Sequence, residues 1–111
     1  MNFNTNPGKV YLIVALLKDG TTQYKIGVSK HPKKRLLEIK TANPNDLSIV
    51  ETFSSKYPYL VETSLKNRFS YKNIDGEWFD LDADDVSSFI ETCKIMESNF
   101  QVIHQDSTLF N

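Results

Sequence analysis

A dense basic cluster follows the apolar stretch "YKIGV" in this sequence. Its members are Lys30, Lys33, Lys34 and Arg35. Pro32 is tolerated as the first residue of a helix, so Arg35 would lie one turn later, near the helix start. Helix N-termini bind anions through free N–H groups, and arginine binds them through paired donors. The cluster therefore indicates a phosphate-binding site, although a solvated helix face is the simpler explanation for Lys33 and Lys34.

Lys25 is a charged residue among apolar neighbours. Strand alternation places Lys25 and Gly27 on one face, with Tyr24 and Ile26 on the other. The simplest explanation is a long aliphatic stem that carries the ammonium group out to water.

Glu62 lies beside an apolar stripe formed by Val61, Leu65 and Phe69 at four-residue spacing. A carboxylate in such a place is costly without a cation. It could pair with Lys66, one helical turn later, or it could bind a hard divalent cation such as Mg²⁺. The residue types alone leave both explanations open.

The order of apolar segments predicts the elements that position these residues. The turn signal at Asp19-Gly20 separates two β-branched segments and predicts a hairpin. The expected elements are strands over 9–17, 23–28 and 47–53, helices from Pro32 and over 58–69, a short edge at 78–79, and a C-terminal helix over 82–97 with Asp82 as N-cap. This order predicts an α+β domain, with a small antiparallel sheet covered by helices.

The composition predicts one domain over residues 1–111, with mobile ends at 1–7 and 105–111. A single cysteine, Cys93, excludes an internal disulfide and fits a reducing compartment. No apolar run has the length of a signal peptide core or a membrane span, so we expect a cytoplasmic protein. Residues 18–40 carry a balance of +5 and residues 75–111 one of −8, so a basic face and an acidic face are expected if these charges do not intermingle.

Several short motifs resemble those of the GIY-YIG nuclease superfamily. "KVY" at Lys9–Tyr11 and "YKIG" at Tyr24–Gly27 stand where the first and second motifs would be. Arg35 and Glu62 match the helix arginine and the metal-binding glutamate of the family. "GEWFDL" resembles the phage-type branch, and the resemblance covers residues 8–81.

The resemblance implies a three-stranded antiparallel sheet flanked by helices, and a metal-dependent DNA endonuclease that uses Mg²⁺ or Mn²⁺. Tyr11 would be the general base or would orient the attacking water, and neighbouring cations would have to lower its pKa. Lys25 and Arg35 would supply those cations and stabilise the phosphoryl oxygens. Glu62 would hold the metal. The residues expected to bind nucleic acid are Lys30, Lys33, Lys34 and Lys66.

This sequence departs from the family pattern at several positions. Lys25 replaces the tyrosine of the second motif, and the first motif keeps only its tyrosine, Tyr11. Ile39 and Lys66 stand where some relatives have histidine. Two alternatives to an enzyme therefore stay open. One is a catalytically inactive module that binds DNA or RNA, and the other is a protein-interaction factor that acts on a host defence enzyme through its acidic C-terminal third.

Overall fold

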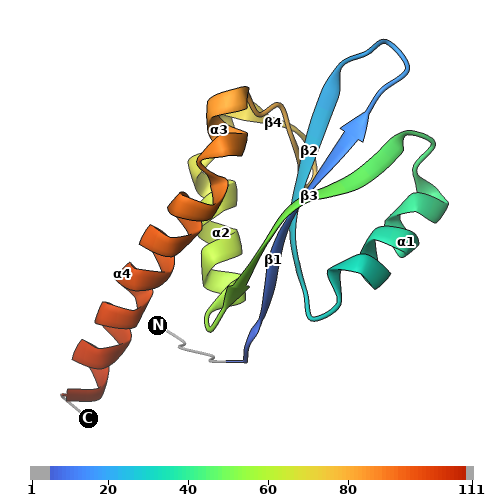
Figure 1. Cartoon of the computed structure of the whole chain (residues 1–111). Helices are drawn as coiled ribbons and strands as arrows, with labels where there is room; N and C mark the ends of the chain where they lie inside the picture. Colours follow the sequence, from blue (N-terminus) through green and yellow to red (C-terminus); the bar gives the residue numbers. More distant parts are fainter. Residues whose placement is uncertain (1–5, 110–111) are drawn as a thin grey trace.

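The structure is a computed structural model that describes residues 6–109, with side chains up to residue 106 (Figure 1). The elements in chain order are β1 (Gly8–Leu16), β2 (Thr22–Ser29), α1 (Pro32–Ala42), β3 (Asp46–Ser55), α2 (Pro58–Arg68), the 3₁₀ turn η1 (Ser70–Lys72), β4 (Asn73–Asp75), β5 (Trp78–Phe79), α3 (Ala83–Ser87) and α4 (Phe89–Leu109). The predicted hairpin, third strand and first two helices are all present, with bounds shifted by one or two residues.

The strands form one sheet in the order β3-β1-β2-β5-β4, with every neighbouring pair antiparallel. The predicted α+β class is confirmed, but the sheet has five strands in the described chain, and the expected three was wrong. The two additional strands form a small hairpin that turns at Gly76, where φ is +55°. β4 is exposed throughout, so it carries no apolar alternation that would reveal a strand in the sequence, whereas β5 is the short edge expected at 78–79.

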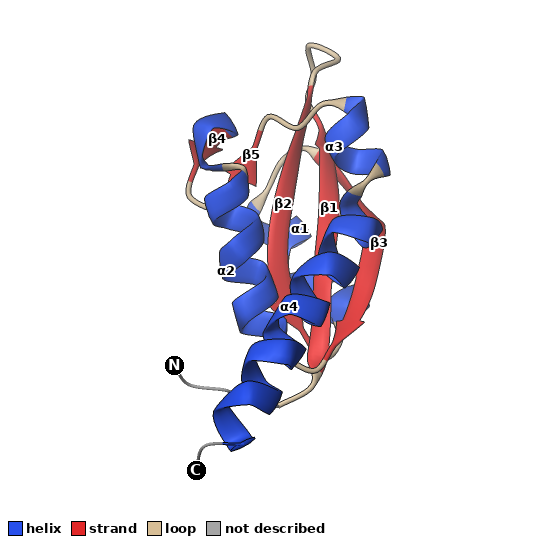
Figure 2. Cartoon of the chain, turned by 90° about the vertical axis from the view of Figure 1, so that its left-hand side faces the viewer, coloured by secondary structure: helices blue, strands red, loops and turns tan. Residues whose placement is uncertain are grey.

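Helices cover both faces of the sheet, as the two views show (Figures 1 and 2). α1 packs on one face, over a small core that includes Tyr11, Ile13 and Leu47. α2 and α4 pack on the opposite face, over a larger core that includes Leu12, Leu65 and Phe79. This arrangement explains why β1 is apolar along almost its whole length, since its residues from Val10 to Ile13 are buried on both faces.

The C-terminal part begins as predicted and ends later. The Asp82 side chain accepts a hydrogen bond from the backbone of Asp85, and the Asp85 side chain accepts one from the backbone of Asp82, which forms a capping box. The predicted helix over 82–97 is divided into α3 and α4, and α4 continues to Leu109.

The ends of the chain were expected to be mobile. Of those residues, 1–5 and 110–111 lie outside the described part of the chain. Within it, β1 begins at Gly8, and residues 105–109 are helical. No helix over residues 6–109 is long and apolar enough to cross a lipid bilayer.

Candidate functional site

Tyr11 and Gly27 form the centre of the site on the α1 face of the sheet. They are paired in register on β1 and β2, and Tyr11 is 2% exposed. A Cβ atom added to Gly27 would lie 2.2 Å from Tyr11 Oη and 2.3 Å from Cζ. The phenol therefore lies directly across Gly27, and only glycine leaves room for it. This gives a steric reason for the glycine of "YKIG".

Arg35 projects from α1 toward Tyr11. Burial raises the pKa of Tyr11, and the guanidinium of Arg35 opposes this shift without reversing it. Arg35 also forms an ion pair with Glu38 at 3.0 Å. Arg35 thus acts on the pKa of Tyr11 in the expected direction, but burial outweighs it and the net shift is upward. Tyr11 is thus a neutral phenol in the free protein at physiological pH.

Lys25 and Glu62 belong to a chain of four alternating charges. Lys25 Nζ lies 2.5 Å from one oxygen of Glu77, and Lys66 Nζ lies 2.8 Å from the other. Lys66 Nζ also lies 3.3 Å from Glu62 Oε2, so the predicted pair one helical turn apart is present. Burial lowers the pKa of Lys66, but Glu77 and Glu62 outweigh it and raise the pKa overall.

The four residues expected to act together come from four separate elements, and the structure relates them in pairs. Lys25 and Arg35 line one hollow, together with Trp78. Glu62 lies close enough to influence the ionisation of Tyr11, and its side chain is only 16% exposed. α2 can reach this position because β5 pairs with only Tyr24 and Lys25, which leaves the rest of the β2 edge uncovered by a strand.

A second hollow, which we call the basic hollow, lies beside Tyr11 at the start of α1. It is lined by Lys9, Lys30, His31, Pro32, Lys33, Lys34, Ile49 and Thr52. Thr52 is the register partner of Tyr11 on β3, so the basic hollow adjoins the centre of the site. Three of the four lysines expected to bind nucleic acid line it, whereas Lys66 lies in the charged chain.

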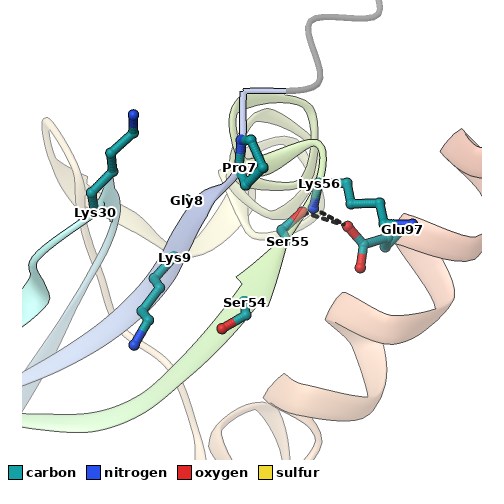
Figure 3. Close-up of a pocket in the computed structure, with 8 residues that line it drawn as sticks. All are labelled: Pro7, Gly8, Lys9, Lys30, Ser54, Ser55, Lys56 and Glu97. Carbon is teal, nitrogen blue, oxygen red and sulfur yellow. Dashed lines mark hydrogen bonds between the residues drawn. The ribbon is translucent and has the colours of Figure 1, made fainter.

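A third hollow shares Lys9 and Lys30 with the basic hollow (Figure 3). It lies where β1 begins and β3 ends. One oxygen of Glu97 on α4 accepts hydrogen bonds from the Ser55 hydroxyl at 2.7 Å and from the Lys56 backbone at 2.6 Å. These bonds join α4 to the end of β3. The side chains of Lys9 and Lys30 point away from each other (Figure 3).

Comparison with models of protein families shows which family the chain belongs to. The family model of the T5orf172 domain matches residues 8–94. The chain belongs to the T5orf172 domain family. That family is related to GIY-YIG nuclease-like domains, so the sequence resemblance is confirmed at this level. None of the curated proteins and none of the solved structures matches the chain significantly.

A magnesium ion at this site of the T5orf172 domain would need carboxylate ligands. No group of three or more His, Cys, Asp or Glu side chains within the described residues could hold a metal ion. Mg²⁺, however, is commonly held by one or two carboxylates together with waters and substrate phosphates. Glu62 and Glu77 supply two carboxylates that converge on Lys66 Nζ. Two carboxylates are enough in number for such an ion, but the ammonium group of Lys66 lies between them in the free protein.

Sequence reasoning missed two residues of the T5orf172 site. Glu77 was given no role beyond its place in "GEWFDL", yet its carboxylate joins Lys25 to Lys66. Lys9 was placed only in the first motif, yet it lines the basic hollow. Strand alternation could have found Lys9, because it puts Lys9 on the same face as Tyr11.

Proposed function

We propose that this T5orf172 domain is a metal-dependent DNA endonuclease of the GIY-YIG type. The observation that supports the proposal is that Arg35 and Glu62 both act electrostatically on Tyr11, while Lys25 shares a hollow with Arg35. A phenol, two cations and a carboxylate are the groups that phosphodiester hydrolysis needs around one phosphorus atom.

Each residue would have one role. Tyr11 would donate or accept a hydrogen bond that orients the attacking water, since its raised pKa keeps the phenol protonated in the free protein. Arg35 and Lys25 would contact non-bridging oxygens and stabilise the charge that develops there. Glu62 would hold Mg²⁺ or Mn²⁺, which supplies Lewis-acid stabilisation when bound.

The basic hollow would bind the backbone of the same DNA strand. Lys30, Lys33 and Lys34 would contact phosphates on one side of the scissile bond, and Lys9 would join them. Such contacts carry little sequence information, so they would position the strand without selecting a sequence.

A catalytically inactive nucleic-acid-binding module is the second candidate. Two observations favour it: the ammonium of Lys66 lies between the two acidic side chains, and the pKa of Tyr11 is raised. Both features leave the basic hollow unchanged, so binding without cleavage is the outcome this candidate predicts.

The test is cleavage of supercoiled plasmid with Mg²⁺ or Mn²⁺ by the wild type, Tyr11→Phe and Glu62→Gln. We expect each substitution to reduce the rate by roughly 100-fold or more. Tyr71→Phe and Glu51→Gln are matched controls, because both residues are exposed and lie outside the site. Salt-sensitive binding without cleavage would favour the inactive module. Cleavage that survives Tyr11→Phe unchanged would refute the proposed role of the phenol.

A further inference from the structure

The carboxylate of Glu77 bridges two ammonium groups from different elements. Its Oε2 lies 2.5 Å from Lys25 Nζ on β2, and its Oε1 lies 2.8 Å from Lys66 Nζ on α2. One small anion with two charged oxygens is therefore held by one donor at each oxygen. A phosphate group offers the same pattern, with negatively charged oxygens on one central atom, and charge-assisted hydrogen bonds of this kind are strong.

The fold fixes the ammonium group of Lys25. Lys25 is 8% exposed, and its ammonium lies 5.8 Å from the centre of the Trp78 ring. Its direction follows from strand alternation, and its depth follows from the packing of α1 on the same face. A buried ammonium requires an anion beside it. Lys25 needs an anion because of where it is buried, and any anion of suitable size could take the place of Glu77.

Glu77, in contrast, is well placed to leave. Its side chain is 45% exposed, and it follows the turn at Gly76 between the two shortest strands of the described chain. Rotation about its side-chain bonds is enough to bring the carboxylate into solvent. The anion beside Lys25 is thus replaceable, whereas the ammonium group of Lys25 stays in place.

We propose that Lys25 and Lys66 form a binding site for a phosphate group, and that the Glu77 carboxylate occupies this site until a phosphate displaces it. The inference rests on the proposed function only for the identity of the ligand. If that function holds, the phosphate belongs to the DNA backbone next to Tyr11. Glu77 then acts as an internal competitor of the substrate. Removing its charge strengthens phosphate binding, which is the opposite of what removing a structural residue does.

The test compares Glu77→Gln with Asp75→Asn, a matched control in the same hairpin. Both substitutions remove one negative charge, and the described contacts of Asp75 include no ion pair. The probes are inorganic phosphate and a short DNA duplex, both in EDTA and at constant ionic strength. Phosphate binding is followed by the rise in melting temperature and by NMR signals of the Lys25 and Lys66 ammonium groups.

We expect Glu77→Gln to bind phosphate roughly ten-fold more tightly than the wild type, as the loss of one competing charge-assisted hydrogen bond would give. Asp75→Asn should change the affinity less than about two-fold, since an exposed charge without a direct contact has a small effect. Glu77→Asp keeps an anion beside Lys25, which protects folding, but is too short to bridge both lysines. We expect it to show an intermediate gain.

Each outcome is decisive. Phosphate affinity in Glu77→Gln that is equal to that in Asp75→Asn, with both proteins folded, overturns the inference, even if the wild type cleaves plasmid. If Glu77→Gln does not fold, a Glu77→Asp variant with wild-type affinity overturns it in the same way. A phosphate gain without DNA binding in any variant, together with no cleavage in the plasmid assay with Mg²⁺ or Mn²⁺, supports the site and refutes the nuclease proposal. A gain with both probes supports a nucleic-acid phosphate as the natural ligand.

Discussion

Replacing Gly27 by alanine tests the geometry on which the candidate site depends. The new Cβ would lie 2.2 Å from Tyr11 Oη and 2.3 Å from Cζ, whereas ordinary contacts begin at about 3.4 Å. The phenol would have to move by more than about 1 Å inside a close-packed layer. Overpacking of this kind costs about 1–3 kcal/mol, which corresponds to a fall in melting temperature of about 4–12 °C for a domain of this size.

Thermal and urea unfolding measure this loss, and Gly8→Ala is the matched control. A Cβ on Gly8 would meet Pro58 Cγ at 3.4 Å, so we expect a change within about 0.5 kcal/mol. In a Tyr11→Ala background the ring is absent, so the destabilisation caused by Gly27→Ala should be smaller by at least about 1 kcal/mol. A Gly27→Ala effect no larger than that of Gly8→Ala, or equal in both backgrounds, would refute the placement of the phenol across Gly27.

Three further predictions concern charge and capping. Glu77→Gln should lower the free energy of unfolding by about 1–2 kcal/mol at neutral pH, because Lys25 loses its partner. Lys25 and Lys66 hold the pKa of Glu77 below its ordinary value of 4.5 despite burial, so this contribution is present above pH 4.5 and disappears as the pH falls further. Urea unfolding at several pH values measures it. The raised pKa of Tyr11 predicts stability that is present below pH 10.0 and lost as the pH rises through the folded value, and Tyr11→Phe should remove this alkaline loss in the same assay. Asp82→Ala should lower the melting temperature, since it breaks the capping box, whereas Asp84→Ala, in the same turn, should change it little.

Apolar periodicity predicted the central part of the fold well. β1, β2, β3, α1 and α2 each carry a clear pattern bounded by glycine, proline or a turn signal, and their bounds are close to those expected. The short edge expected at 78–79 is present as β5, but β4 and the pairing of the two strands were missed, because this pairing depends on contact with β2, which no local pattern records. The end of α4 was placed too early, although no glycine or proline follows Gly76 to stop a helix.

The candidate site was predictable where a residue's direction follows from its own element. Strand alternation gave the shared face of Lys25 and Gly27, and the pairing of Glu62 with Lys66 follows from helix geometry. Glu77 could not be found in this way, because its role depends on how a two-residue strand places it between β2 and α2. The pKa of Tyr11 also depends on burial, which outweighs the charge of Arg35 and is not visible in the sequence.

The basic hollow and the pair Lys25 and Lys66 would contribute differently to phosphate binding. In the free protein Arg35 is paired with Glu38, and Lys25 and Lys66 are paired with Glu77, so the cations nearest Tyr11 are already neutralised by carboxylates. Long-range attraction of a polyanion must then come from the basic hollow, whose lysines surround the start of α1. A phosphate drawn there reaches the paired cations only by displacing a carboxylate. Affinity and its salt dependence should therefore follow the lysines of the basic hollow, whereas the discrimination between a phosphate and other anions should follow the pair that Glu77 occupies.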